Sequence, residues 1–223
     1  MSYRLKEKLG EGAFGNIYRL EDKDGNDIAY KVIEAKNLNY IELDIMSRLF
    51  SPYLIRTVDP KILDYNGIKG LTRTVKEETL KNLDTKSLPY IQLKRIIISS
   101  IYGLRCMHRK GFLHLDVSSS NILYDRDNEE NYTAYLSDFG WSARCNNAYQ
   151  GIISTKVLRY KLTPLEILEG ETISGYENKV RKYSDKSDIW NMGMVILELL
   201  GVTLENYNSE KHIKSIKNID DIS

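Results

Sequence analysis

The sequence predicts an α+β fold of two lobes, because its apolar residues follow mainly strand spacing in the first part of the chain and mainly helical spacing in the second. Up to about residue 76, short apolar runs are separated by turn residues, a pattern typical of strands. From Leu88 onward, apolar residues recur at helical spacing. We therefore predict an N-terminal lobe with an antiparallel sheet and one helix, a mainly helical C-terminal lobe and a polar tail, at residues 1–76, 77–204 and 205–223.

A glycine-rich turn and a hairpin signal organise the N-terminal lobe. Gly10 to Gly15 separates two strand-like runs, and Asp24-Gly25-Asn26-Asp27 marks a second turn. Residues 39–50 carry apolar side chains at helical spacing, and Ser51-Pro52 ends that predicted helix. The predicted strands are residues 4–9, 16–21, 28–33, 62–64 and 69–75.

A long helix is expected at the start of the C-terminal lobe. Pro89 suits its first turn. Its buried stripe is expected to consist of Ile91, Ile97, Ile98, Ile101, Leu104 and Met107. Two short strands, near Leu123 and Leu136, are expected to bracket a polar turn at residues 127–131. The last strong helix is expected from about Ser187 to Leu200.

Composition and charge exclude several classes of protein. The 223 residues carry 32 basic and 31 acidic side chains, and a net charge of +1 gives no general case for binding nucleic acid or an anionic membrane. No apolar run approaches the roughly 20 residues that span a bilayer, and the N-terminus does not open a signal peptide. Cys106 and Cys145 alone provide no disulfide framework. We expect a cytoplasmic protein, in the host cytoplasm if the chain is viral.

Two motifs in the first lobe fit phosphate binding. Glycines at 10, 12 and 15 allow backbone N–H groups to approach phosphate oxygens, because glycine has no Cβ to clash. Taken alone, this turn is equally well an ordinary hairpin. Lys31 follows Ala29 on the next predicted strand. Taken alone, it would be a solvated lysine.

Two motifs in the second lobe fit metal and hydroxyl chemistry. In the run from His114 to Asn121, Asp116 is placed to orient a hydroxyl and Asn121 to bind a metal. Asp138, followed by Phe139-Gly140, supplies another carboxylate. Such hard oxygen ligands, together with substrate phosphates, suit Mg²⁺.

In this order, the four motifs resemble those of the eukaryotic protein kinase family, from about Leu5 to about Leu200. The resemblance implies a two-lobed kinase fold, ATP and Mg²⁺ as cofactors, and transfer of the γ-phosphoryl group to serine or threonine of a protein substrate. The serine/threonine preference rests on the fold alone. The residues it implies for nucleotide binding are Leu9, Gly10, Glu11, Gly12, Ala13, Phe14, Gly15, Ile17, Ala29, Lys31, Glu42 and Leu123.

The resemblance also assigns roles. Asp116 and Lys31 are the catalytic residues, and Asn121 and Asp138 the metal ligands. Glu42 would hold Lys31 in place, with Asp44 as the second candidate and a plain surface carboxylate as the alternative reading. His114 is interpreted as structural, packing against Phe139, and Asp188 as a brace for the catalytic-loop backbone.

Two departures from the family pattern lie in the catalytic loop. Leu115 stands where the family usually has an arginine that responds to phosphorylation of the activation segment. Its presence argues against regulation by such phosphorylation. Ser118 stands where serine/threonine kinases carry lysine, and Ser118-Ser119-Ser120 also lacks the arginine of tyrosine kinases. Losing one such contact typically costs on the order of 10²–10³ in rate. Lys156 or Lys161 is a hypothetical substitute.

A third departure concerns the end of the lobe. Thr163-Pro164-Leu165-Glu166 has an extra residue relative to the Ala-Pro-Glu of the family, and few residues follow Leu200. We therefore expect a compact kinase lacking the last helices. Its final helix would either belong to a minimal lobe or expose apolar surface that a partner covers.

Three functions fit these residues. The leading one is a serine/threonine-protein kinase, since all five residues expected for nucleotide, metal and catalysis are present: Lys31, Glu42, Asp116, Asn121 and Asp138. An ATP-binding pseudokinase that acts as scaffold or regulator is favoured by Ser118 and by the short C-terminal lobe. A small-molecule phosphotransferase of the aminoglycoside-kinase type is disfavoured by Phe14 and by the run Asp188 to Gly193, which look like those of protein kinases.

Overall fold

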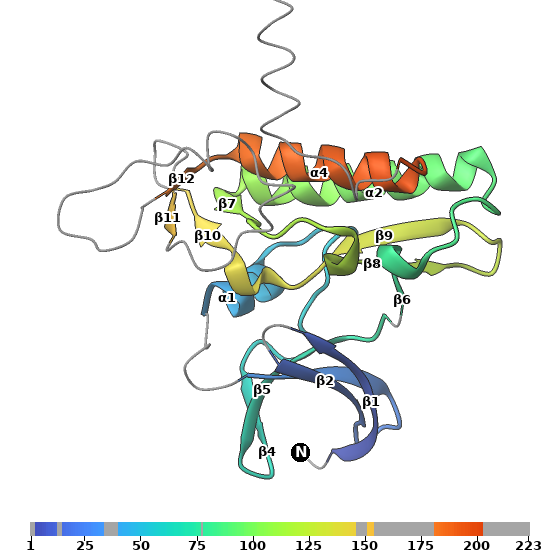
Figure 1. The fold of residues 1–223 in the computed structure, drawn as a ribbon. Coiled ribbons are helices and arrows are strands. Elements are labelled where there is room, and N and C mark those ends of the chain that lie inside the picture. The colour runs from blue at the N-terminus through green and yellow to red at the C-terminus, as the bar shows by residue number, and fades with distance from the viewer. Residues whose placement is uncertain are drawn as a thin grey trace, which may run out of the picture.

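The computed structural model describes residues 3–12, 15–33, 40–76, 78–145, 151–153 and 181–202. Its N-terminal part is a five-stranded antiparallel sheet with the strand order β1-β2-β3-β5-β4 (Figure 1). The strands are β1 (Arg4–Gly12), β2 (Gly15–Glu21), β3 (Asp27–Val32), β4 (Ile62–Tyr65) and β5 (Ile68–Thr74). All five predicted strands are therefore confirmed in position, and the residues between β1 and β2 lie outside the described part of the chain.

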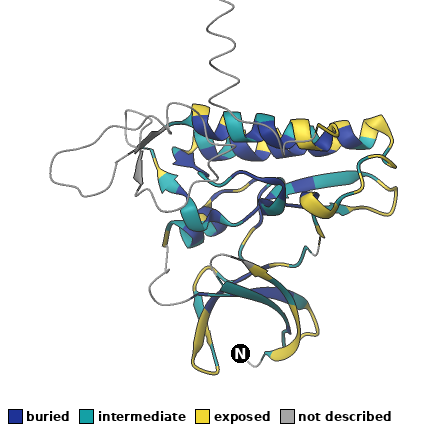
Figure 2. Cartoon of the chain, in the orientation of Figure 1, coloured by how far each residue is buried: buried dark blue, intermediate teal, exposed yellow. Residues whose placement is uncertain are grey.

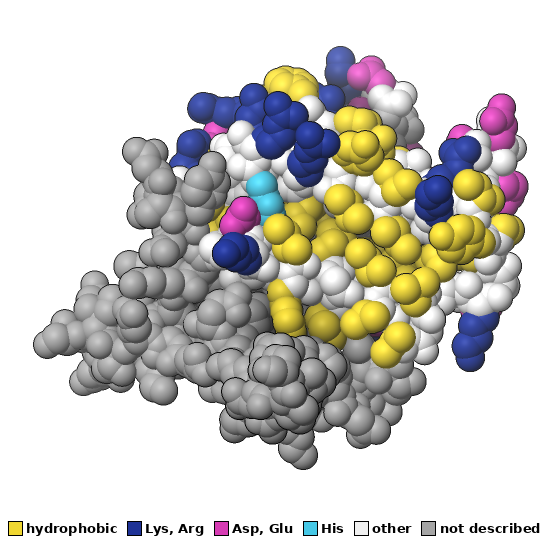
Figure 3. All heavy atoms as spheres, turned by 90° about the horizontal axis from the view of Figure 1, so that it is seen from above, with side chains coloured by type: hydrophobic (Ala, Val, Ile, Leu, Met, Phe, Trp, Pro, Cys, Tyr) yellow, Lys and Arg dark blue, Asp and Glu magenta, His cyan; other side chains and the backbone are white. Residues whose placement is uncertain are grey.

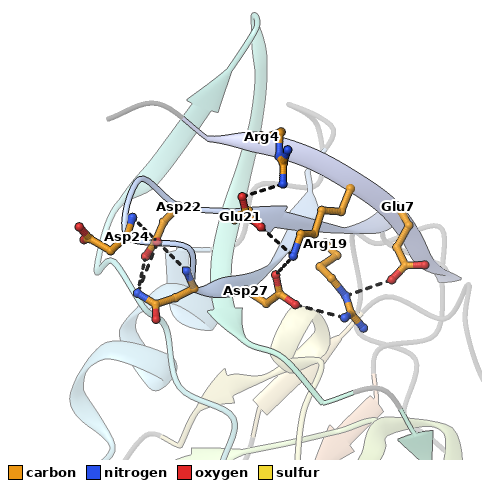
Figure 4. A network of polar contacts seen from close by, with 9 residues as sticks. Arg4, Glu7, Arg19, Glu21, Asp22, Asp24 and Asp27 are labelled. Atoms are coloured by element: carbon orange, nitrogen blue, oxygen red, sulfur yellow. Dashed lines mark hydrogen bonds and ion pairs between the residues drawn. The ribbon is translucent and has the colours of Figure 1, made fainter.

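The β2–β3 turn forms where the sequence carries its hairpin signal. The Asp22 carboxylate accepts hydrogen bonds from the backbone N–H groups of Asp24 and Asn26, both at 2.9 Å. Gly25 supplies the positive φ of 81° that this turn needs. Figure 4 shows this turn beside ion pairs that link the first three strands, such as Arg4 to Glu21 at 2.8 Å. Exposed pairs of this kind add little stability each.

Helix α1 (Tyr40–Arg48) joins the sheet to the rest of the molecule. It buries Ile45 and Met46 against the 3-10 turn η4 (Phe139–Trp141). The chain that follows α1 pairs with a strand of the second lobe, since the N–H of Ile55 donates to the carbonyl of Leu136 at 2.9 Å. The main hydrophobic core therefore runs from α1 into the second lobe, whereas Leu20, Ile28 and Tyr30 form a smaller cluster on the sheet.

Two helices lie side by side in the second lobe, α2 (Tyr90–Arg109) and α4 (Asp185–Leu199) (Figure 1). Ser184 caps α4 by accepting the N–H of Lys186, and its backbone N–H donates to the Ser187 hydroxyl. A three-stranded sheet packs under α2, in the order β6 (Glu78–Thr79), β8 (Ile122–Arg126), β9 (Tyr132–Leu136). The remaining elements are β7 (Phe112–Leu113) with β10 (Ala143–Arg144), β11 (Gly151–Ile153) with β12 (Arg181–Tyr183), η2 (Leu80–Asn82) and η3 (Ser119–Asn121).

The predicted two-lobed α+β fold is confirmed, but the predicted buried face of α2 is wrong in part. Ile91, Ile98 and Ile101 are 54%, 40% and 43% exposed. Leu104 and Met107 are buried as predicted, and Ile97 is half-buried. The helix also buries Leu93 and Ile96 together with three small residues, Ser99, Ser100 and Gly103. A Cβ on Gly103 would lie 2.6 Å from the carbonyl oxygen of Tyr53, so the helix turns this small residue toward the neighbouring backbone.

The faces of α2 and α4 that point away from the sheets remain partly apolar. Figure 2 shows exposed positions along both helices, and Figure 3, a view onto this side, shows hydrophobic side chains gathered there. Ile98, Ile101, Ile189, Leu197 and Leu200 are all at least 36% exposed. The lobe boundaries 1–76, 77–204 and 205–223 stay a prediction, because Glu77 and residues 203–223 lie outside the described residues.

Candidate active site

A buried lysine gathers two carboxylates between the sheet and the second lobe. Lys31 on β3 is 4% exposed, and its Nζ donates to the Glu42 oxygens at 2.7 and 3.0 Å and to Asp138 Oδ1 at 2.8 Å. Glu42, in the first turn of α1, is itself only 5% exposed. Asp44, the second candidate, pairs with Arg48 and Arg144 instead. The structure therefore places Glu42 beside Lys31, as the sequence predicted.

The charges of this cluster stabilise one another. Burial would lower the pKa of Lys31, but the neighbouring Glu42 and Asp138 outweigh it and raise that pKa above its ordinary value. Burial would raise the pKa of Asp138, but Lys31, and then Arg73 and His114, hold it below its ordinary value. Both partners are thus charged at neutral pH.

Protonation of Asp138 is expected to weaken the folded state in acid. Because its folded pKa lies below the unfolded one, the unfolded chain takes up this proton at higher pH, and stability falls as pH drops below about 4. The variant Asp138→Asn should lose this part of the pH dependence. Urea unfolding at pH 6 and at about pH 3 checks it, with Asp84→Asn, an exposed aspartate before α2, as the control that should keep the wild-type profile. Identical profiles for wild type and Asp138→Asn would contradict the prediction.

The catalytic-loop residues are held together by backbone and side-chain hydrogen bonds. Asn121, at the end of η3, donates through Nδ2 to the carbonyl oxygen of Asp116 at 2.8 Å and to its Oδ2 at 2.6 Å. The Asn121 carbonyl accepts from the backbone N–H and hydroxyl of Ser137, at 2.9 and 3.0 Å. Ser137 directly precedes Asp138, so these bonds fix Asp116, Asn121 and Asp138 in one site.

Asp188, near the start of α4, braces this loop from below. It is fully buried, and its carboxylate accepts from the backbone N–H groups of His114 and Leu115, each at 2.8 Å. His108 Nε2 lies 2.8 Å from the same carboxylate. Leu115 has a positive φ of 65°, a conformation that is costly for leucine and is retained only where its surroundings fix it. The bracing position expected for Asp188 is present, and His108 is a contact that the sequence did not reveal.

His114 is buried behind the loop that carries Asp138. Its ring packs edge-on against Phe139, with ring centroids 5.5 Å apart, and its Nε2 lies 3.1 Å from the Ser137 carbonyl oxygen. Asp138 adopts a left-handed conformation with φ of 60°, which directs the chain into η4. His114 thus occupies the structural position expected of it.

Strands β1 and β2, which carry Gly10, Gly12 and Gly15, turn their backbone toward the site. Gly12 pairs with Gly15 across the β1–β2 turn, and a Cβ on Gly15, whose φ is +132°, would lie 2.3 Å from the Val32 carbonyl oxygen. Only glycine fits this position, which keeps the turn close to the strand that carries Lys31. Ala13 and Phe14, also predicted to bind nucleotide, lie outside the described residues.

The apolar residues expected to hold a purine base come from both sheets. Leu9, Ile17 and Ala29 lie on three adjacent strands, where Ile17 pairs with Gly10 and Lys31. Leu123 is buried on β8. Glu11, in contrast, is exposed and pairs with Lys8, so only its backbone suits a ligand.

Two further residues bear on the site. Ser118, in place of the usual lysine, is 8% exposed, and its hydroxyl has no hydrogen-bond partner among the described residues. A buried neutral hydroxyl does not supply the missing charge. Arg73 on β5 is also 8% exposed, a burial that was not predicted. The signal was available, because Arg73 alternates in phase with Leu71, a core residue of the same strand.

The residues that fit a divalent metal are Asp138 and Asn121. Among the described residues, no group of three or more histidine, cysteine, aspartate or glutamate side chains could hold a metal ion by itself. A metal at this site would therefore need phosphate oxygens and water as further ligands, which is the preference of Mg²⁺. Within the same part of the chain, no helix is long and apolar enough to cross a membrane.

Comparison with known proteins agrees with this geometry. Residues 3–223 match the family described as protein kinase domain, and the chain belongs to that family. It is 32% identical to the proline-rich receptor-like protein kinase PERK12 of Arabidopsis thaliana, over 89% of this chain and 27% of that protein. It is 24% identical to the serine/threonine-protein kinase shk2 of Schizosaccharomyces pombe, over 89% of this chain and 33% of that protein. The chain thus spans about a quarter to a third of these relatives.

Proposed function

We propose that this chain is a serine/threonine-protein kinase that transfers the γ-phosphoryl group of ATP to a hydroxyl of a protein substrate. The observation that carries the proposal is the cluster of Lys31, Glu42 and Asp138, which joins three distant parts of the sequence at contacts of 2.7–2.8 Å. A buried lysine held between carboxylates is oriented as a phosphate-binding group requires. Relatives named as serine/threonine-protein kinases support the choice of hydroxyl.

Each residue has a distinct part in the proposed reaction. Lys31, fixed by Glu42, binds the α- and β-phosphates, and the backbone of Gly10 to Gly15 covers the triphosphate. Asp116 orients the attacking hydroxyl and accepts its proton late in the transfer. When bound, Mg²⁺ would be held by Asn121 and Asp138, and it would neutralise charge on the phosphates.

The nucleotide base is assigned to the apolar surface between the lobes. Leu9, Ile17 and Ala29 form its upper wall, and Leu123 its lower one. Ala29 and Leu123 are apolar, and an apolar site with few polar groups suits a purine ring.

An ATP-binding pseudokinase is the second candidate, and Ser118 is the observation that favours it. A serine there removes a cation that would contact the transferring phosphoryl group, a loss of about 10²–10³ in rate. Lys156 and Lys161, the hypothetical substitutes, lie outside the described residues, as does Thr163-Pro164-Leu165-Glu166. The intact set of five catalytic and nucleotide-binding residues places the kinase ahead.

The location and the partners of the protein are proposed from its cysteines, its exposed apolar side chains and its charge. Cys106 and Cys145 are both free, which fits the reducing cytoplasm. The exposed apolar side chains of α4, Ile189 and Leu197 among them, support a partner that covers this side of the lobe. The nearly balanced charge supports neither nucleic acid nor an anionic membrane as partner.

Phosphoryl transfer from γ-labelled ATP to generic protein substrates tests the proposal. Label should be incorporated with Mg²⁺ and lost when the metal is chelated, and Asp138→Asn, purified in parallel, should show the same loss. No incorporation, with ATP still raising the melting temperature, would favour the pseudokinase. Neither transfer nor binding would overturn both candidates.

A further inference from the structure

The second lobe carries a hollow with a volume of about 380 Å³ between α2 and the segment that follows α1. Helix α2 contributes Tyr102 and Cys106 to its lining, and the other segment contributes Phe50 to Tyr53. The described residues that line it include none of those assigned to nucleotide, metal or substrate hydroxyl. The hollow is therefore a separate candidate for binding.

Aromatic side chains form its apolar walls. The rings of Tyr53 and Tyr102 stack with their centroids 5.8 Å apart. Gly103, beside Tyr102, leaves no room for a Cβ against the Tyr53 carbonyl oxygen, so the two walls are in direct contact. Tyr102 and Phe50 nevertheless keep 47% and 75% of their surface exposed. Such rings offer a ligand a large contact area at little cost in conformational entropy.

Cations surround the hollow. Arg105 and Arg109 are one helical turn apart near the end of α2, and Lys110 follows directly. All three are exposed, and among the described residues none of their side chains forms an ion pair or a hydrogen bond. A fourth cation, the Arg56 guanidinium, lies 4.8 Å from the centroid of the Phe50 ring. Figure 3 shows Lys and Arg side chains along one edge of the hydrophobic surface of the two helices.

The described residues near the hollow do not neutralise this charge. No carboxylate is among those that line it. In α1, the neighbouring helix, Glu42 is paired with Lys31 at 2.7 Å. Asp44 is paired with Arg48 and Arg144. Unpaired cations around an apolar hollow favour a ligand that is both acidic and apolar.

A peptide fits these features better than a nucleic acid. A volume of about 380 Å³ is at the small end of ligand pockets and suits one or two side chains. Single-stranded nucleic acid needs free ring faces on which its bases stack. One face of the Phe50 ring is already covered by Arg56, and Tyr53 and Tyr102 cover one another. A net charge of +1 also provides no long basic track for phosphates.

We propose that this hollow binds an acidic peptide segment of a partner protein. One apolar side chain of the segment occupies the hollow, and its carboxylates pair with Arg105, Arg109 and Lys110. The inference goes beyond the proposed phosphoryl transfer, because the hollow shares no described residue with the candidate active site.

Arrays of short immobilised peptides test this inference without any nucleotide. In each peptide one leucine, phenylalanine, tyrosine or tryptophan is flanked by glutamates, and in a matched array glutamines replace the glutamates. The full chain should bind members of the acidic array and not their glutamine counterparts. Fluorescence anisotropy of the peptide that binds best then gives its dissociation constant. Raising the salt from about 0.1 M to about 1 M should weaken this binding, because it shortens the range of electrostatic attraction.

Two pairs of variants locate the binding. The double variant Arg105→Gln, Arg109→Gln should weaken it by about threefold or more, since each exposed ion pair is worth about 1.4- to 5-fold in affinity. Its control is Lys94→Gln, Arg95→Gln, which removes the same charge from exposed positions of α2 outside the hollow and should retain wild-type affinity. Tyr102→Ala should likewise weaken binding by about threefold. Tyr90→Ala, at an exposed tyrosine in the first turn of α2, should not.

Several results would overturn the inference. Wild type that binds no acidic peptide, or binds the glutamine array equally well, would do so whether or not the variants fold. Equal losses in a variant and its control would place the attraction elsewhere on the surface. Tighter binding of a single-stranded oligonucleotide than of any acidic peptide would indicate a nucleic-acid site instead. Peptide binding by a chain that transfers no phosphoryl group would overturn only the proposed kinase function.

Discussion

Replacing Asp116 by alanine is expected to slow phosphoryl transfer by about 10²–10⁴-fold while nucleotide binding persists. Asp116 is fixed by the Asn121 amide, whose Nδ2 lies 2.6 Å from its Oδ2, so its carboxylate has one defined direction. A substrate hydroxyl loses both its orientation and its proton acceptor when this group is removed. This substitution leaves the phosphate-binding groups unchanged, namely Lys31 and the strands that carry Gly10, Gly12 and Gly15.

The measurement compares initial rates of transfer from labelled ATP with the rise in melting temperature that ATP and Mg²⁺ produce. Asp84→Ala, at an exposed aspartate in the loop before α2, is the control and should retain the wild-type rate. If Asp116→Ala kept more than about a tenth of that rate, Asp116 would not have the role proposed for it. Loss of the thermal shift would instead indicate a damaged nucleotide site.

The largest loss of stability is expected from Asp188→Ala, about 3–5 kcal/mol of the free energy of unfolding. Its carboxylate is fully buried and accepts two backbone N–H groups at 2.8 Å. Without it, the N–H groups of His114 and Leu115 would remain in the interior with no acceptor, and each unpaired group costs about 1–3 kcal/mol. The left-handed conformation of Leu115 would also lose the bond that stabilises it.

Urea unfolding of wild type, Asp188→Ala and Asp185→Ala gives the comparison. Asp185 lies in the same helical turn but is partly exposed, and its carboxylate accepts a hydrogen bond from the adjacent backbone N–H of Lys186. Its replacement should cost no more than about 1 kcal/mol, the usual value of a carboxylate at a helix N-terminus. Equal losses for both variants would mean that Asp188 acts only through the end of α4.

Local sequence patterns gave the strands and most helix limits. The five strands of the first sheet lie within a few residues of the predicted ranges, because turn residues such as Gly25 impose their geometry locally. The predicted face of α2 was wrong because this helix is apolar on more than one side. Which side is buried depends on β9 and on the backbone at Tyr53, which approach Ser99 and Gly103 from elsewhere in the chain.

The residues of the candidate site likewise fall into those that the sequence predicted and those that were found only in the structure. Motif spacing predicted Lys31, Asp116, Asn121 and Asp138, and helix position favoured Glu42 over Asp44. Arg73 was missed although it alternates in phase with Leu71, because a lone basic residue on a strand is usually solvated. His108 was missed for a comparable reason, because its contact to Asp188 spans 80 residues of sequence.

By itself, the sequence determined the family, the order of the elements and the residues that carry the proposed chemistry, because motif spacing and hydrophobic period are local properties of the chain. Only the tertiary structure decided which carboxylate pairs with Lys31, which face of α2 is buried, and that Arg73 lies beside Ala29. These outcomes depend on the packing of segments up to 107 residues apart, as between Lys31 and Asp138. A short stretch of sequence does not reveal the electrostatic and steric surroundings that contacts between distant segments create.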